Sequence, residues 1–434
     1  MDKNKRLTVW LPVIIAASIA LGIFIGNHYL SISQGKKRSY SSGNKINAIL
    51  DIIDEQYVDT VSMSKLVEST IPKIFSELDP HSVYIPAEDA SVVNEELEGS
   101  FSGIGVSFNM QTDTILVISV ISGGPAEKAG LLPFDRIISI NDSIFSGKKK
   151  NQGEIMKTLR GAKNSTVKLG VQRGNSPELL YFDVTRGDVP VNSVDVSFEA
   201  AKGIGYIKVS KFARNTYNEF ITAIAKLKQA GCTSFVIDLR GNTGGYMDAA
   251  INMINEFMPE GRLIVYTEGK SFPRSDVYAN GTGTCKDAPI VVLTDEISAS
   301  ASEIFSGAIQ DNDRGTIIGR RTYGKGLVQT QMSLSDGSEM RLTIARYYTP
   351  SGRCIQKKYE MGNTDAYDQD IYNRYMHGEF DSADSIKMDD SLKYQTVGGR
   401  TVYGGGGIMP DIFIPRDTSG VTSYLSLIHI SEPT

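Results

Sequence analysis

Two side chains suited to acyl transfer, Ser300 and Lys325, lie 25 positions apart in this chain. Ser300 sits in a run of small residues between an apolar segment, residues 289–293, and a segment with helical periodicity. A serine on such a strand–turn–helix junction projects from the edge of a sheet, and the next amide, that of Ala301, points toward the group that the hydroxyl attacks. Lys325 lies between two glycines, which let another backbone approach closely.

The second requirement is a base, because a serine hydroxyl is a weak nucleophile until its proton is removed. Histidine is the usual base, but His28 ends an apolar N-terminal segment and His429 lies in an atypical tail, which leaves His81 and His377. A lysine can replace histidine if burial lowers its pKa from about 10.4 by roughly three units. We therefore predict a buried Lys325 beside the serine. A Ser/His site that uses His81 or His377 is the alternative.

Each of these residues also has a plain structural explanation. Ser300 and Glu303 fit the S-x-x-E capping box, so the serine could simply cap a helix. Ser298 and Ser302 are neighbouring candidates for the nucleophile, and an isolated lysine is normally a solvated surface residue.

The segments SASASEI (residues 298–304) and YGKGLVQ (residues 323–329) resemble the carboxyl-terminal processing, or tail-specific, proteases, which are serine peptidases with a Ser/Lys dyad. The resemblance covers residues 46–415. It implies that Ser300 is the nucleophile, Lys325 the general base and Gln329 the residue that orients the lysine amine, with a supporting role for Asp311. Because four residues of straight strand span about 13 Å, the chain must bend at the glycines for Gln329 to reach the amine. No metal and no organic cofactor is expected.

The oxyanion hole is predicted from a second motif, DLRGNTGG (residues 238–245). Glycines at the end of a buried strand place amides at the carboxyl edge of the sheet, where the sites of α/β proteins gather. The motif resembles the family's DLRxNxGG, whose glycine amide joins the amide after the serine. This implies Gly244 or Gly245, with Gly245 preferred, together with Ala301.

Residues 99–187 change to short strands and turns, and GPAEKAGL (residues 124–131) with DRIISIN (residues 135–141) resembles a PDZ domain. Glycines before its first long strand permit a nest of amides for a terminal carboxylate, and the strand edge can accept a peptide. The predicted peptide-binding residues are Gly103, Ile104, Gly105, Val106 and Phe108. Ile155 and Leu159 complete the pocket or belong to the core, and Arg160 caps its helix or links the domain to the catalytic site.

The fold expected from these patterns is an α/β protease core, with layered βα units around a mixed sheet, and an inserted PDZ domain. An N-terminal helical segment and one transmembrane helix precede it. Within the helical segment, LDPHSVY (residues 78–84) resembles a family motif, and we expect His81 to be structural. Residues 359–392 are expected to form an irregular insertion. The predicted domains are 1–30 membrane anchor or signal, 31–43 linker, 44–98 helical region, 99–187 PDZ domain, 188–425 serine protease domain and 426–434 a tail that does not continue the pattern.

The composition and the N-terminal segment limit the classes of function that this chain can have. The chain has 434 residues, 41% of them hydrophobic, and a net charge of -5, so no basic surplus indicates nucleic-acid binding. Residues 7–25 are apolar and follow three basic residues, which favours a retained anchor with the body outside the cytoplasm over a cleaved signal peptide. Cys232, Cys285 and Cys354 show no metal spacing, and either one disulfide or three free thiols fits.

Together these features predict an extracytoplasmic, periplasmic serine endopeptidase that is anchored to the inner membrane. Its partners are protein substrates, recognised by their C-terminal tails, and the membrane; its oligomeric state is not predicted. The alternative is a non-catalytic PDZ scaffold that binds protein tails.

Overall fold

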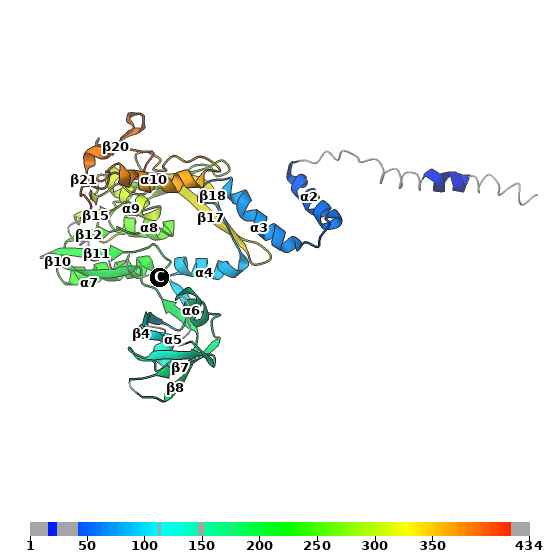
Figure 1. Ribbon diagram of the computed structural model, residues 1–434. Helices are drawn as coiled ribbons and strands as arrows, with labels where there is room; N and C mark the ends of the chain where they lie inside the picture. The colour runs from blue at the N-terminus through cyan, green and yellow to red at the C-terminus, as the bar shows by residue number, and fades with distance from the viewer. Residues whose placement is uncertain (1–15, 24–41, 112–113, 146–151, 175, 418–434) are drawn as a thin grey trace, which may run out of the picture. The chain divides into compact units, whose positions relative to one another are not determined.

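The computed structural model describes residues 16–23, 42–111, 114–145, 152–174 and 176–417 (Figure 1). The chain divides into two compact units, Met1–Thr70 and Ile71–Thr434. Helix α2 (Ser42–Gln56) belongs to the first unit, and α3 (Met63–Ser76) spans the boundary. Among the described residues, no helix combines the length and apolar character needed to cross a bilayer. Most of the predicted anchor, most of the linker and the whole tail of residues 426–434 lie outside the described residues.

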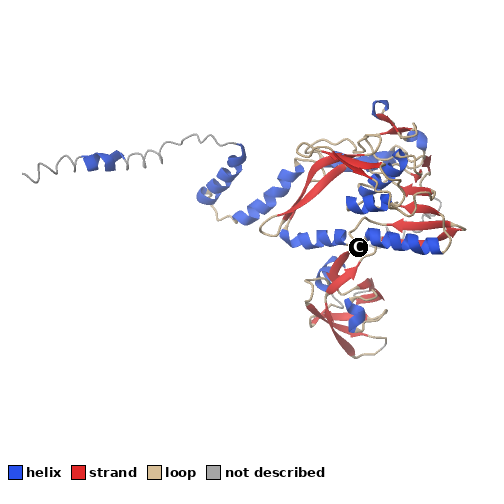
Figure 2. Ribbon diagram, turned by 180° about the vertical axis from the view of Figure 1, so that it is seen from behind, coloured by secondary structure: helices blue, strands red, loops and turns tan. Residues whose placement is uncertain are grey.

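The predicted protease region is built on a six-stranded sheet with the order β10-β11-β12-β15-β16-β21. The strands from β11 to β21 run parallel, and β10 pairs antiparallel with β11. Figure 2 shows these strands in red beside the helices that connect them. The strands are β10 (Val194–Ala201), β11 (Ile204–Val209), β12 (Ser234–Asp238), β15 (Ile290–Thr294), β16 (Thr316–Gly319) and β21 (Ile412–Phe413), and the helices are α7 (Thr216–Gln229), α8 (Met247–Asn255) and α9 (Ala301–Asp311).

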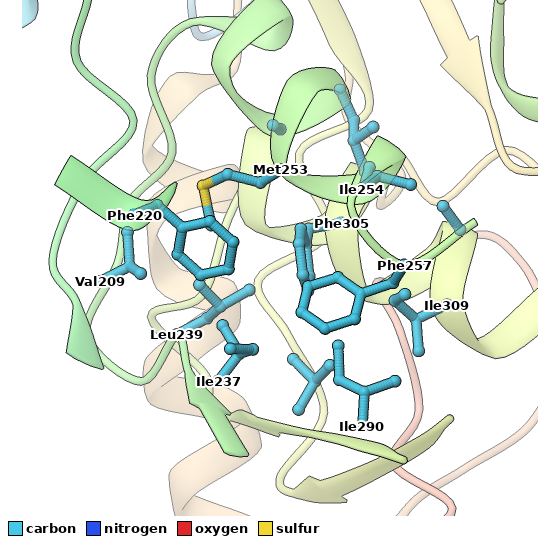
Figure 3. Close-up of a cluster of buried hydrophobic side chains, with 14 of the residues drawn as sticks. Val209, Phe220, Ile237, Leu239, Met253, Ile254, Phe257, Ile290, Phe305 and Ile309 are labelled. Atoms are coloured by element: carbon cyan, nitrogen blue, oxygen red, sulfur yellow. The ribbon is translucent and has the colours of Figure 1, made fainter. Parts of the chain in front are cut away.

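Buried hydrophobic side chains, most of them aliphatic, fill the core between this sheet and its helices (Figure 3). Phe257, just after α8, makes edge-to-face contacts with Phe220 of α7, Phe235 of β12 and Phe305 of α9. All four rings are almost completely buried. Burial of each such side chain contributes about 2–3 kcal/mol, so this cluster fixes α9, and with it the turn that carries Ser300.

A second, antiparallel sheet accompanies the first, whereas the sequence predicted a single mixed sheet. β13 follows α8 in the chain but pairs antiparallel with β14, to which a short connection leads, and with the remote strand β18. β17 and β18 form a long hairpin that carries the segment after Lys325. The strands are β1 (Val83–Ile85), β13 (Leu263–Glu268), β14 (Ser275–Tyr278), β17 (Leu327–Ser333) and β18 (Glu339–Tyr348).

The PDZ region contains a sheet with the order β3-β4-β5-β7-β8 and β6 paired to β5. Its strands are β3 (Val106–Gln111), β4 (Thr114–Val120), β5 (Arg136–Ile140), β6 (Ser143–Ile144), β7 (Thr166–Gln172) and β8 (Leu179–Thr185), with α5 (Pro125–Ala129) and α6 (Gln152–Leu159). β2 (Ser100–Gly103) and β9 (Gly187–Pro190) pair where the chain enters and leaves the domain, and α4 (Ala87–Glu98) precedes them. This PDZ core has its own hydrophobic cluster.

The expectation of an irregular insertion at residues 359–392 is wrong, because α10 (Thr364–Met376) lies within it. The buried face of α10 carries Tyr367 and Arg374, seven residues apart, and Arg374 binds Glu379 and the carbonyl oxygens of Arg321 and Thr322. Since this face is aromatic and charged rather than aliphatic, apolar periodicity did not reveal the helix. Two short 3-10 helices (Ala383–Ser385 and Asp390–Leu392) and the pair β19 (Lys393–Gln395) and β20 (Thr401–Tyr403) follow it.

Candidate active site

Ser300 lies at the turn between β15 and α9, with φ 55° and ψ −112°. A positive φ is rare for a residue with a side chain. It costs about 1–3 kcal/mol and persists only where the surrounding structure holds the residue in that conformation. Ser300 is partly exposed, and it forms a capping box with Glu303 at the start of α9. Ser298 and Ser302 are fully buried, and their hydroxyls donate to the carbonyl oxygens of Leu239 (2.8 Å) and Asn242 (2.9 Å). Ser300 is therefore the accessible hydroxyl of the three.

The buried carboxylate of Glu303 connects the Ser300 turn with the Lys325 segment. One of its oxygens accepts hydrogen bonds from the backbone amides of Ser300 and Lys325, each at 2.8 Å. The other accepts from the Gly324 amide (2.7 Å) and the Thr322 hydroxyl (2.5 Å). Burial raises the pKa of Glu303, while these four donors oppose the rise. From sequence, Glu303 was considered only as a helix cap, so this second role was missed.

Tyr347 of β18 makes a further connection between the same two segments. Its fully buried hydroxyl lies 3.0 Å from the carbonyl oxygen of Ser300 and within hydrogen-bond distance of that of Lys325. Glu303 therefore binds the backbone amides of both Ser300 and Lys325, and Tyr347 binds their backbone carbonyl oxygens. This arrangement brings the Ser300 and Lys325 backbones together.

The Lys325 side chain is mostly buried, and its pKa is lowered. Burial is the main cause, and the positive charge of Arg341 adds to it, while the carboxylates of Glu303 and Asp79 oppose the change. Within the described residues the amine forms no ion pair. A lysine in this setting can lose its proton far more easily than one in water.

Two backbone amides beside Ser300 lack partners among the described residues: those of Gly245 and Ala301. The Gly244 amide, in contrast, donates to the side chain of Asn242 at 2.9 Å. A Cβ on Gly244 would lie 2.8 Å from Cβ of Ser300, which explains the glycine. The buried Asn242 also accepts the Ala299 amide at 3.0 Å and so fixes this loop against the serine turn. Of the two glycines, only Gly245 has an amide available for an oxyanion.

The side-chain nitrogen Nε2 of Gln329 donates a hydrogen bond to the backbone carbonyl oxygen of His81. Burial, followed by the charge of Lys325, lowers the pKa of His81 to about 4. The His81 ring nitrogen Nε2 lies 2.9 Å from the Tyr367 hydroxyl. His377 is exposed, and its ring bonds to its own helix at the Asn373 carbonyl. Neither ring hydrogen-bonds to Ser300, and the structural role expected for His81 stays a prediction.

Asp311 and the three cysteines lie apart from these contacts. Asp311 forms an ion pair with Arg353 at 2.7 Å, and both side chains are completely buried. It also accepts the Ser351 amide, so it holds the turn after β18. Cys232, Cys285 and Cys354 are free thiols. In the described ranges, no group of His, Cys, Asp or Glu residues has the arrangement of a metal site.

The predicted peptide site of the PDZ domain lies along β3, an edge strand whose one partner in the sheet is β4. The carbonyl oxygens of Ile104 and Gly105 accept bonds from Ala126 and Ile121, and Gly105 has φ 77°. Gly103 ends β2, and Val106 and Phe108 are partly buried on β3. Ile155 and Leu159 of α6 belong to the core, and Arg160 forms an ion pair with Glu95 of α4 at 3.6 Å.

Comparison with known proteins places these sites in two families. Residues 203–365 match peptidase family S41, and residues 102–195 match the PDZ domain. Carboxy-terminal processing protease CtpB of Bacillus subtilis is 35% identical over 73% of this chain and 66% of its own length. A probable CtpA-like serine protease of Staphylococcus aureus is 33% identical over 82% of this chain and 72% of its own length. The solved photosystem II D1 C-terminal processing protease aligns with a TM-score of 0.43 and 24% identity, over 87% of this chain and 94% of that one.

Proposed function

Because this chain belongs to peptidase family S41, a family of serine-type peptidases that includes carboxy-terminal processing proteases, we propose that it is a serine endopeptidase that acts on protein tails. Its PDZ domain binds the C-terminal tail by adding it as a strand beside β3. Peptide bonds are then cleaved by a dyad of Ser300 and Lys325.

In the proposed reaction, the neutral Lys325 amine takes the Ser300 proton as the hydroxyl oxygen attacks the scissile carbonyl carbon. The amides of Gly245 and Ala301 donate to the oxyanion that forms, and one such donor contributes about 3 kcal/mol to transition-state stabilisation. Collapse of the tetrahedral intermediate breaks the C–N bond, and the lysine returns the proton to the leaving amine. Water then hydrolyses the acyl-enzyme by the same steps, and no cofactor takes part.

One observation carries this proposal: a single oxygen of Glu303 accepts the backbone amides of both Ser300 and Lys325. A capping box accounts for the bond from the Ser300 amide, but not for the bond from the Lys325 amide to the same buried oxygen. The lowered pKa of Lys325 and the two unpartnered amides beside Ser300 supply the remaining parts of an acyl-transfer site.

The test is cleavage of an unstructured protein tail by the wild type, Ser300→Ala and Lys325→Ala. We expect both variants to lose cleavage and to keep their affinity for a tail peptide. An active Lys325→Ala variant would exclude the dyad. A wild-type protein that binds tails but never cleaves them would instead be a scaffold.

We also propose that residues 7–25 anchor the protein in a membrane with its body outside the cytoplasm. The support is the apolar run itself and the basic residues Lys3, Lys5 and Arg6 ahead of it, which favour the cytoplasmic side. In spheroplasts, whose outer envelope has been opened, added protease should digest the body, and alkaline carbonate should leave the protein in the membrane fraction. Release by carbonate or protection from the protease would overturn this topology.

A further inference from the structure

The loop at residues 79–82 is fixed to the β17–β18 hairpin by the carboxylate of Asp79. This carboxylate accepts the backbone amides of His81 (3.0 Å) and Ser82 (3.1 Å) and the hydroxyls of Ser82 (2.5 Å) and Thr343 (2.8 Å). The Ser82 hydroxyl in turn accepts the Thr343 amide at 3.1 Å. Partial burial opposes ionisation of Asp79, but these bonds outweigh it and hold the pKa below its usual value.

The His81 carbonyl of this loop determines which way the Gln329 amide faces. A carbonyl oxygen can only accept hydrogen bonds, so the NH2 group of Gln329 must point toward it and the side-chain oxygen Oε1 must point away. That oxygen has no hydrogen-bond partner in the described part of the chain. The β17–β18 register shifts between Val328 and Gln329, and such a bulge redirects the side chain that follows it.

The Lys325 amine is close enough to the same loop for their charges to interact. Asp79 raises the pKa of Lys325, and Lys325 in turn lowers the pKa of His81. The loop therefore neighbours both Gln329 and the amine. A neutral amine has two N–H donors and one lone pair, so holding one N–H fixes the direction in which the lone pair points.

We propose that the loop at residues 79–82 orients Gln329 so that its Oε1 accepts a hydrogen bond from the Lys325 amine and directs the lone pair of the amine at Ser300. Asp79 is then a positioning residue that acts through Gln329. This inference rests on the proposed Ser/Lys mechanism. It assigns a task to a segment that lies ahead of the PDZ domain in the chain, far from the catalytic motifs in sequence.

A double-mutant cycle tests this proposal: kcat and KM for a tail substrate are measured for Asp79→Ala, Gln329→Ala and the double variant. We expect each single variant to lose kcat on the order of 100-fold, as for a misplaced catalytic group, with KM little changed. The double variant should lose no more than either single variant, because both changes remove the same orientation. Tail binding should stay at the wild-type level throughout.

Asp336→Ala is the matched control, because Asp336 also caps a turn by accepting the amide and hydroxyl of Ser338, at the far end of the same hairpin. It should keep wild-type kcat. Asp79→Asn keeps an oxygen for the His81 and Ser82 amides and should recover most of the activity. By removing a negative charge it should also lower the pKa of Lys325, so the acid limb of the kcat/KM profile shifts to lower pH.

Losses that multiply in the double variant would overturn the proposal, since Asp79 would then act by another route. Wild-type kcat in Asp79→Ala would overturn it as well. If Asp79→Ala fails to fold, Asp79→Asn decides: an acid limb that does not move, or that moves to higher pH, contradicts the placement of the loop beside the amine. Failure of the dyad itself is distinguishable, because it would appear as activity in Lys325→Ala.

Discussion

Replacement of Glu303 by glutamine gives a sharp test of the carboxylate that joins the segments of Ser300 and Lys325. Each carboxylate oxygen accepts two donors, and glutamine offers one oxygen and one NH2 group. If the NH2 group faces Ser300 and Lys325, two backbone amides lose their acceptor. If it faces Gly324 and Thr322, the hydroxyl can rotate but the Gly324 amide cannot. A buried donor left unpaired costs about 1–3 kcal/mol, so the free energy of unfolding should fall by at least that amount.

The assay combines urea denaturation with steady-state cleavage of a tail substrate. We expect Glu303→Gln to lose kcat about 10–100-fold, because a shift of the Gly324–Lys325 backbone misplaces the base. Glu219→Gln is the matched control: one Glu219 oxygen accepts the Ser193 and Val194 amides, and glutamine keeps an oxygen there. The other oxygen accepts the Asn215 NH2 group, and Asn215 can turn its side-chain amide over so that its own oxygen, which has no partner among the described residues, accepts from the new NH2 group. This control should change stability little and activity not at all. A Glu303→Gln variant with wild-type stability and kcat would refute the reasoning.

Three further predictions follow from buried or shifted charges. The pKa of His81 is about 4, against 6.5 for a free side chain. Between these two pH values the unfolded chain therefore carries a proton on His81 that the folded chain does not. The free energy of unfolding should therefore drop by about 2 kcal/mol between pH 7 and 4.5, and His81→Asn should abolish that drop in urea titrations. Arg341→Gln removes a charge that lowers the pKa of Lys325, so the acid limb of kcat/KM should shift to higher pH; an unmoved limb contradicts this. Asp311→Ala leaves Arg353 buried and unpaired, which should cost about 3–5 kcal/mol in denaturation while titrated active sites keep their kcat.

The motifs that carry the candidate site could be found from sequence because each is a local pattern of residues. Small residues between an apolar strand and a helical segment predicted the turn that carries Ser300, and glycines after a buried strand predicted the loop of Gly244 and Gly245. The family matches confirm the resemblance that was drawn from these motifs. The order of residues along the chain was sufficient to predict the Ser300 turn and the loop of Gly244 and Gly245, because the residues of each motif are neighbours in sequence.

The contacts that join the motifs could not be predicted, because they are made by residues remote in sequence. Nothing in the pattern around Glu303 shows that its carboxylate also serves Gly324 and Lys325, since a capping box accounts fully for its position. The loop of His81 meets Gln329 across 248 positions. The helix at α10 was missed because its buried face is formed by Tyr367 and an arginine rather than by aliphatic residues.

The site also contains an electrostatic conflict that explains its composition. Holding the backbones of Ser300 and Lys325 requires an acceptor with four lone-pair sites, which an ionised glutamate provides. The same negative charge raises the pKa of Lys325 and so opposes the neutral amine that the proposed reaction needs. Burial of the lysine, the positive charge of Arg341 and the absence of a direct ion pair to the amine among the described residues act in the opposite direction. The carboxylate of Glu303 therefore bonds to the backbone amides of Ser300 and Lys325, and among the described residues it forms no ion pair with the Lys325 amine. Glu303 can thus hold the two backbones while the amine remains available for the proposed proton transfer.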